Sequence, residues 1–166
     1  MRFDTVLFDL DMTLVDTSSL FDLRKQRRWN DVYANLSNTI IFDDIDGILK
    51  KLKEKYKIGV VTSSPGKYAK KVIDHHELDI PILCAYHDTR KHKPSPEPLL
   101  FALTKINSTP SKAIYIGDEI NDIIASKKAG LSSGAVIWGM DHKENIISAK
   151  PNIVFTQVSE IGSYLL

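Results

Sequence analysis

The sequence lacks the features that mark secreted or membrane proteins. It has 166 residues but a single cysteine, Cys84, which excludes an internal disulfide framework and suits a reducing cytoplasm. No apolar run approaches the roughly 18–20 residues needed to cross a bilayer. The amino terminus also lacks the long apolar core of a signal peptide. We therefore expect a cytoplasmic protein with no membrane partner.

The sequence also lacks an excess of charge of one sign, since it has 22 Lys and Arg residues and 21 Asp and Glu residues. This balance gives no overall field toward nucleic acid, so we expect no nucleic-acid partner. Neither G-x-x-x-x-G-K-[ST] nor G-x-G-x-x-G occurs, which argues against a nucleotide kinase or a dinucleotide enzyme. The sequence leaves the oligomeric state open.

Short β-rich apolar runs alternate with helical patterns along most of the chain. The runs predict strands at 5–8, 58–61, 82–86, 113–116, 134–138 and 152–155. The helical patterns lie at 43–56, 67–75, 96–106, 120–129, 143–149 and from 158 onward. We expect one domain, residues 1–166, with a doubly wound, Rossmann-like α/β fold in which helices cover both faces of a parallel sheet.

Residues 17–41 interrupt this alternation after the first strand. Apolar residues recur at loosely helical spacing up to about Ser37, and Thr17 or Ser18 could cap such a helix. The segment also carries a basic cluster, residues 24–28 (Arg-Lys-Gln-Arg-Arg), which is either a solvated helix face or a lip that attracts an anionic substrate. We expect a small, helical, cap-like insertion that is too short for a full lid.

Polar side chains collect where the predicted strands end. They are Asp9 and Asp11, Thr62 and Ser63, Asp118 with Asp122 one turn later, and Lys93 in a loop before Pro94. Ligands of open parallel sheets bind at the carboxyl ends of the strands, so these side chains should share one crevice. Packed carboxylates repel unless a cation lies among them, and an acid-rich set of oxygen donors suits Mg²⁺. A carboxylate can also attack phosphorus to form an aspartyl-phosphate.

These residues resemble the four signature motifs of the haloacid dehalogenase superfamily. The motifs are Asp9-Leu10-Asp11-Met12-Thr13, then Thr62 after an apolar strand, then Lys93-Pro94, then Gly117-Asp118-Glu119-Ile120-Asn121-Asp122. The resemblance covers residues 3–137, nearly the whole chain, with the motifs in the expected order. Met12 departs from it, because glycine is frequent at that position in the family, so the local turn is in question.

The resemblance implies a role for each of these residues. Asp9 would be the nucleophile, Asp11 the general acid/base and Lys93 the charge-stabilising lysine, while Thr62 would bind the phosphoryl group. Ser63 is a second candidate for phosphate binding. Mg²⁺ would be held by Asp9, the backbone carbonyl of Asp11 and Asp118, with Asp122 as a ligand or as a supporting neighbour of the ligands.

We thus expect a magnesium-dependent phosphohydrolase that cleaves a phosphate monoester of unknown size through an aspartyl-phosphate. A phosphotransferase remains an alternative within the enzyme class. A binding or regulatory module that kept the phosphate site without useful turnover is an alternative from another class. A dehalogenase is disfavoured, because carbon–halogen cleavage needs no acid such as Asp11 on the leaving group.

Overall fold

The structure is a computed structural model that describes residues 3–138 and 143–166. A six-stranded sheet lies at its centre, and every pair of neighbouring strands in the order β5-β4-β1-β6-β7-β8 is parallel. The strands are β1 (Thr5–Phe8), β4 (Lys57–Val61), β5 (Ile82–Cys84), β6 (Ala113–Gly117), β7 (Ser132–Val136) and β8 (Ile153–Phe155). The prediction of a doubly wound, Rossmann-like α/β fold is confirmed.

The helices around this sheet follow the predicted alternation. They are α3 (Ile45–Lys53), α4 (Gly66–His75), α5 (Glu97–Ile106), α6 (Ile120–Ala129), α7 (Lys143–Ser148) and α8 (Ser159–Leu165), with 3-10 helices η3 (Tyr86–Asp88) and η4 (Pro110–Lys112) between them. None of the helices in the described part of the chain is long and apolar enough to cross a membrane.

The sheet is buried on both faces because successive strand residues point to opposite sides. On β1, Val6 and Phe8 belong to one apolar cluster with α3 and α8, whereas Leu7 belongs to a second cluster with α5 and α6. Continuous apolar runs are typical of strands that are covered on both faces. The chain leaves β1 toward β4 and leaves β6 toward β7, so a switch point lies between the carboxyl ends of β1 and β6.

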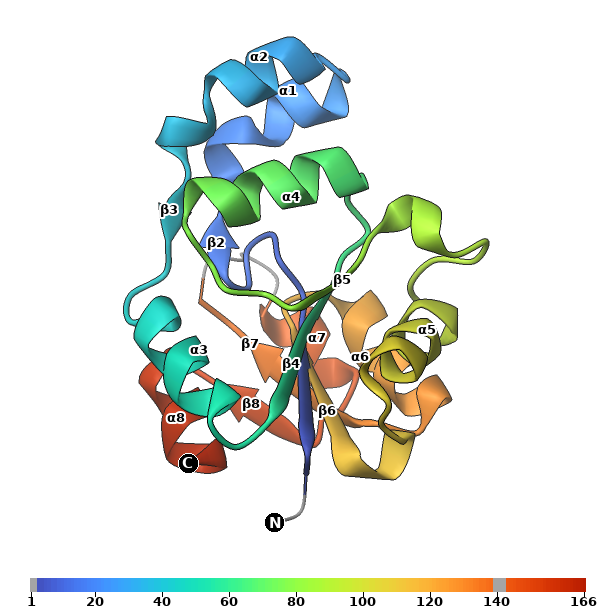
Figure 1. Cartoon of the computed structure of the whole chain (residues 1–166). Coiled ribbons are helices and arrows are strands. Elements are labelled where there is room, and N and C mark those ends of the chain that lie inside the picture. The colour runs from blue at the N-terminus through green and yellow to red at the C-terminus, as the bar shows by residue number, and fades with distance from the viewer. Residues whose placement is uncertain (1–2, 139–142) are drawn as a thin grey trace.

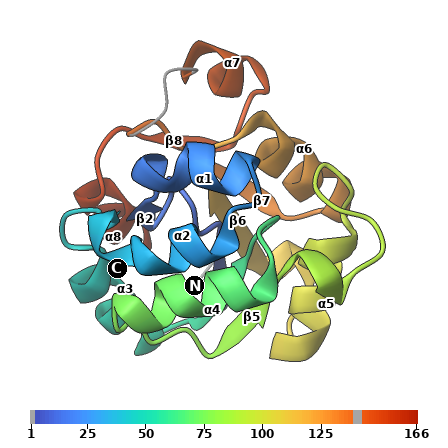
Figure 2. The ribbon, with the colours of Figure 1, turned by 90° about the horizontal axis from the view of Figure 1, so that it is seen from above.

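Residues 17–41 lie beyond these carboxyl ends. They contain η1 (Ser18–Leu20), α1 (Phe21–Lys25), α2 (Trp29–Ala34) and η2 (Leu36–Asn38), and a small antiparallel pair of β2 (Val15–Asp16) and β3 (Ile40–Ile41) joins them to the core. In Figure 1, α1 and α2 lie at the top, higher than α4, and all three helices lie above the carboxyl ends of the strands. Figure 2, seen from above, shows α1, α2 and α4 side by side over the sheet.

The structure corrects the local expectations in several places. The helical pattern of the insertion is broken into short helices, with Arg27 in the left-handed region at φ 56°. Neither Thr17 nor Ser18 caps a helix with its side chain, because the Thr17 hydroxyl instead donates to Asp11.

Two strand boundaries also differ from the prediction. The strand expected at 134–138 begins and ends two residues earlier, at 132–136. The one expected at 82–86 ends at Cys84, after which residues 86–88 form η3.

Candidate active site

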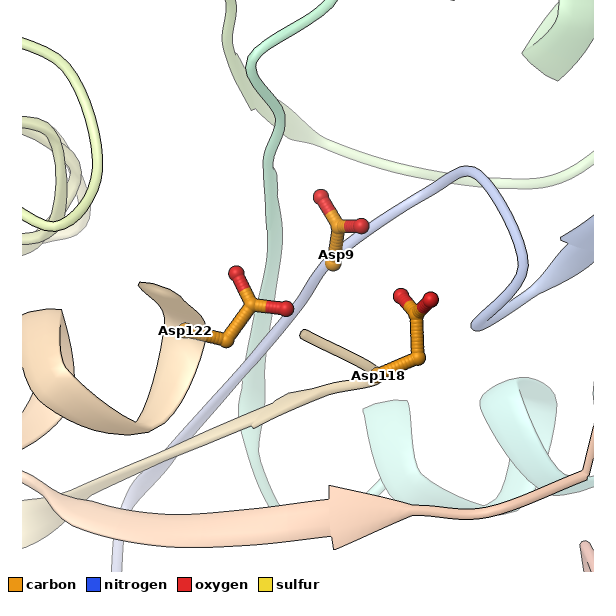
Figure 3. A group of neighbouring side chains, drawn as sticks. All are labelled: Asp9, Asp118 and Asp122. Atoms are coloured by element: carbon orange, nitrogen blue, oxygen red, sulfur yellow. The ribbon is translucent and has the colours of Figure 1, made fainter. Parts of the chain in front are cut away.

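Three aspartates meet at the carboxyl ends of β1 and β6. Asp9 follows β1, Asp118 follows β6, and Asp122 lies in the first turn of α6. One carboxylate oxygen from each lies within 4.8 Å of the other two, and all three residues are buried. Figure 3 shows the three carboxylates around one shared space. Their proximity follows from the parallel pairing of β1 with β6, which ends both strands at the same edge.

Lys93 is the cation at the centre of this acidic cluster. Its Nζ donates to Asp9 Oδ1 at 2.9 Å, to Asp122 Oδ1 at 2.6 Å and to the Tyr115 hydroxyl at 2.8 Å. Only 4% of its side chain is exposed. Burial alone would lower the pKa of Lys93, but Asp122 and Asp9 raise it well above its usual value, so the ammonium stays charged.

Asp122 positions Lys93 rather than facing the cavity. Its Oδ1 accepts from Lys93, and its Oδ2 accepts from the backbone N–H of Glu119 at 3.0 Å. This second hydrogen bond is also part of the cap at the start of α6. Gly117 makes this position possible, because a Cβ there would lie 2.3 Å from Asp122 Oδ2. With both oxygens engaged, Asp122 fits the role of supporting neighbour better than that of direct metal ligand.

Asp9 and Asp118 keep oxygens that could hold a cation. Within the described residues, one hydrogen bond reaches each carboxylate: Lys93 donates to Asp9 Oδ1, and Thr13 donates to Asp118 Oδ1 at 2.9 Å. Burial, with the neighbouring carboxylates, raises the pKa of Asp9 to about 7 and that of Asp118 to about 9. Two buried carboxylates with open oxygens are a donor set that suits a divalent, oxygen-preferring cation, so the residues fit Mg²⁺.

Asp11 lines the same cavity and is held by a dense set of donors. Its Oδ1 accepts from Thr17 at 2.7 Å, from Tyr68 at 2.6 Å and from Arg24 at 2.8 Å. Its Oδ2 accepts from Ser64 at 2.6 Å and from Arg24 at 3.3 Å. Arg24 belongs to α1, so the insertion supplies the positive partner of the predicted acid/base residue.

The two candidate phosphate-binding residues, Thr62 and Ser63, follow the end of β4 and differ in their burial. Thr62 is buried, and its Oγ1 accepts from the backbone N–H of Ser64 at 3.1 Å. Ser63, between Thr62 and Ser64 in the sequence, is exposed. Both line the cavity, so both lie where they could contact a phosphoryl group.

A cavity of about 540 Å³ connects these groups. Asp9, Asp11, Lys93, Asp118, Thr62 and Ser63 line it from the core, and Phe21, Arg24, Lys25 and Trp29 line it from the insertion. The structure therefore brings every predicted site residue except Asp122 to one cavity wall, and places Asp122 directly behind Lys93.

Met12 adopts the left-handed backbone conformation, at φ 61°. This conformation favours glycine, which explains why the family often has glycine there. The turn still forms, because the Met12 N–H donates to the Val15 carbonyl at 2.7 Å. The departure at Met12 leaves Asp9 and Asp11 in the cavity wall.

Comparison with known proteins identifies the family. The family model for haloacid dehalogenase-like hydrolases matches residues 21–136. The chain belongs to this family of hydrolases. The resemblance inferred from the four motifs, and the prediction of an enzyme of this type, are thereby confirmed.

Among the curated relatives, the pyrophosphatase PpaX of Bacillus cereus is 24% identical over 97% of this chain and 95% of its own length. A phosphoglycolate phosphatase of Psychrobacter arcticus is 31% identical over 82% of this chain, which spans 61% of that protein. The alignment with the B. cereus protein runs over 206 positions, more than the 166 residues of this chain, so that relative carries residues that this chain lacks.

Solved structures of similar proteins share the fold. The crystal structure of a predicted phosphoglycolate phosphatase from Haemophilus somnus superposes with a TM-score of 0.87 over 100% of this chain and 99% of its own, at 21% identity. A predicted phosphatase from Clostridium acetobutylicum gives a TM-score of 0.81 over 99% and 98%, at 22% identity.

Sequence reasoning missed the residues that support the named ones. The Tyr115 hydroxyl accepts from Lys93 and donates to the Val61 carbonyl at 2.7 Å, a role that no pattern in the sequence indicates. Ser64 and Tyr68, which contact Asp11, carry no motif signal in the sequence, and Arg24 stands out there only as part of the basic cluster at residues 24–28. For Ser64, its place two residues after Thr62 was the available hint.

Proposed function

We propose that this chain is a magnesium-dependent phosphohydrolase that cleaves a phosphate monoester through an aspartyl-phosphate on Asp9. The observation that carries the proposal is the position of the Asp9 carboxylate. Lys93 holds its Oδ1, while Oδ2 accepts no hydrogen bond from the described residues and lies at the wall of an open cavity. A fixed, desolvated carboxylate beside a buried ammonium is suited to attack an anionic phosphoryl group, whose charge the ammonium offsets.

The residues of the chain account for both halves of the reaction. Asp9 attacks phosphorus, the bond from phosphorus to the leaving oxygen breaks, and that oxygen takes a proton from Asp11. Water then loses a proton to Asp11 and attacks the aspartyl-phosphate, which releases inorganic phosphate and restores the Asp9 carboxylate. Thr62 and Ser63 would donate to phosphoryl oxygens from the end of β4.

Asp9, Asp118 and the Asp11 backbone carbonyl would hold Mg²⁺. When bound, the ion neutralises charge on the transferring phosphoryl group and on the two aspartates. Asp122 would keep Lys93 in place behind Asp9. Thr13 would orient Asp118 through the hydrogen bond to its Oδ1.

The named activities of the relatives support hydrolytic release of phosphate without fixing the substrate. They include a pyrophosphatase and phosphatases of phosphoglycolate and of N-acetylmuramic acid 6-phosphate. We propose a cytoplasmic location for this chain, in keeping with its single thiol, Cys84, which is buried and unpaired.

The test measures phosphate release from an aryl phosphate and a panel of phosphorylated metabolites, with Mg²⁺ or with EDTA, for wild type and Asp9→Asn. Release that requires Mg²⁺ and disappears in Asp9→Asn supports the proposal. No release by folded wild-type protein with Mg²⁺ would contradict it.

Two further measurements separate the alternatives. Beryllium fluoride, a phosphate mimic, should be trapped on Asp9 by an enzyme of this type, and trapping should fail in Asp9→Asn. Equal binding of a ligand by wild type and Asp9→Asn, without turnover in either, would favour a binding module. Transfer of phosphate to an added alcohol in preference to water would favour a phosphotransferase.

A further inference from the structure

The cavity has two walls of different character. The core wall contains Asp9, Lys93 and Asp118, where the proposed function places the phosphoryl group. The insertion wall consists of Phe21, Arg24, Lys25 and Trp29. Among the described lining residues, this second wall has two cations and no carboxylate. The part of the substrate that leaves with the oxygen must face this wall, since the core wall is occupied by the phosphoryl group.

Arg24 is already arranged to hold an anion. Both of its terminal nitrogens donate to the Asp11 carboxylate, and Nη2 also donates to Ser64 Oγ at 2.8 Å. Its guanidinium carbon lies 4.5 Å from the centre of the Tyr68 ring, which fixes the plane of the fork. The side chain is nevertheless 23% exposed toward the cavity side of α1. A planar, oriented guanidinium is suited to two-point recognition of a carboxylate or a phosphate.

Arg24 also differs from its basic neighbours. Arg28 pairs with Asp31 at 2.8 Å on the exposed surface, with 56% of its side chain accessible, and does not line the cavity. Lys25 lines the cavity and is exposed, and it adds positive charge there without an ion pair to any of the residues that the structure describes. The basic cluster at residues 24–28 is thus divided: its first two residues face the substrate cavity and Arg28 does not.

We infer that Arg24 determines specificity by binding a second anionic group, a carboxylate or a phosphate, on the leaving part of the substrate. This inference rests on the proposed function and deepens it by naming the substrate class. It has a structural consequence for Asp11. A guanidinium that moves toward the substrate's anion gives up part of its contact with Asp11 and frees a carboxylate oxygen for the leaving oxygen. Substrates without the second anion would leave Asp11 fully engaged by its donors.

The experiment compares three series of alkyl monophosphates with two-, three- and four-carbon chains. Their far ends are a methyl group, a carboxylate or a second phosphate, and kcat and KM are measured with saturating Mg²⁺. In wild type, an anionic end should raise kcat/KM at least tenfold over the methyl end for at least one chain length, as expected for a charge-assisted contact. The carboxylate and phosphate series distinguish the two anions.

Arg24→Gln keeps hydrogen-bonding groups near Asp11 and Ser64 but removes the charge. It should reduce the advantage of the anionic end to less than threefold, mainly through KM, while Arg24→Lys keeps part of that advantage. Arg28→Gln is the matched control and should keep the wild-type ratio. Thermal unfolding of each variant confirms that the proteins compared are folded.

Some results would overturn the inference. One is turnover of the methyl series by wild type with no advantage for either anion at any chain length. Another is an equal loss in all three series in Arg24→Gln, which would mean that Arg24 only supports Asp11. Both leave the proposed function standing, because wild type still hydrolyses phosphate esters. Absence of turnover in all three series would instead overturn the proposed function together with the inference.

Discussion

The two walls of the cavity are built in different ways. On the core wall, Asp9 and Asp118 are each 6% exposed and directly follow the ends of β1 and β6, and Lys93 donates to Asp9. On the insertion wall, Phe21 is 62% exposed and α1 has five residues. The carboxylates proposed to act on phosphorus thus lie at the ends of sheet strands, whereas the groups proposed to select the substrate lie on short helices with little burial. Rigid elements hold reacting groups more precisely than short surface segments do.

The strongest test of the core wall is Asp9→Asn. An amide of nearly the same shape cannot attack phosphorus, so we expect the turnover rate to fall by at least about 10³-fold. The fold should survive, because the amide oxygen can still accept from Lys93. Phosphate release and thermal unfolding of the same preparation measure the two effects. Turnover within tenfold of wild type would show that Asp9 is not the nucleophile.

Removal of the buried ammonium of Lys93 should destabilise the whole fold as well as abolish turnover. Lys93→Met leaves the carboxylates of Asp9 and Asp122 buried without their cation, and breaking such a pair costs about 3–5 kcal/mol. We expect a loss of that size in the free energy of unfolding at pH 7, measured by urea denaturation, together with loss of turnover. Lys105→Met, at an exposed lysine on α5, is the control and should change stability little. Equal stability of the two variants would contradict the central role of Lys93.

The residues of the core wall could be predicted from the sequence because of where they lie along it. Asp9 follows a continuous apolar run, and Asp118 follows another, so strand periodicity alone placed both at one edge of the sheet. The resemblance to the superfamily then supplied their roles. Gly117 and Tyr115 could not be given theirs, because what they do depends on side chains that only the folded chain brings near them.

The insertion wall was harder to predict for a physical reason. Short helices with few buried residues have weak periodicity, so the pattern from Thr17 to Ser37 suggested a longer helix than the chain forms. The sequence showed five adjacent residues, four of them basic, but not which of them face the cavity. That depends on the break at Arg27, whose left-handed backbone separates α1 from α2. The contact of Arg24 with Asp11, which distinguishes it from its basic neighbours, exists only in the folded chain.

The raised pKa values of the core-wall carboxylates predict that stability depends on pH, with an effect of intermediate size. Because the pKa of Asp9 is raised to about 7 and that of Asp118 to about 9, their protonated forms are favoured in the metal-free folded protein. This contribution to stability is complete below pH 4 and is lost as the pH rises through 7 and 9. In EDTA, the melting temperature should fall between pH 6 and 9.

Mg²⁺ should oppose that fall, since a bound cation favours the charged carboxylates. At about 100 times its dissociation constant, a ligand that binds only the folded state adds roughly 2.7 kcal/mol. The melting temperature measured with and without Mg²⁺ at pH 8 checks this, with Asp118→Asn as the variant that should respond least. An equal rise in wild type and Asp118→Asn would show that the cation binds elsewhere.

The smallest expected effect concerns the join between the insertion and the core. Thr39, at the end of the insertion, lies with its Oγ1 2.7 Å from Nε2 of His76, which follows α4. Thr39 Oγ1 also donates to the Leu36 carbonyl, so the imidazole N–H is the donor to Thr39. Burial and the neighbouring His75 lower the pKa of His76. The stability that depends on neutral His76 is therefore present above about pH 6.5 and is lost as the pH falls below it.

His76→Gln isolates this contribution, because the amide can still donate to Thr39 but does not titrate. With saturating Mg²⁺ to keep the carboxylates charged, wild type should lose slightly more stability than the variant between pH 7 and 5. The difference should be only roughly 0.2–0.5 kcal/mol, since much of the imidazole remains in contact with solvent. His87→Gln, at an exposed histidine, serves as the control. A difference above 1 kcal/mol would mean that the Thr39–His76 contact is a strong link between the insertion and the core. The weakly held part of the insertion would then be α1 and α2 alone.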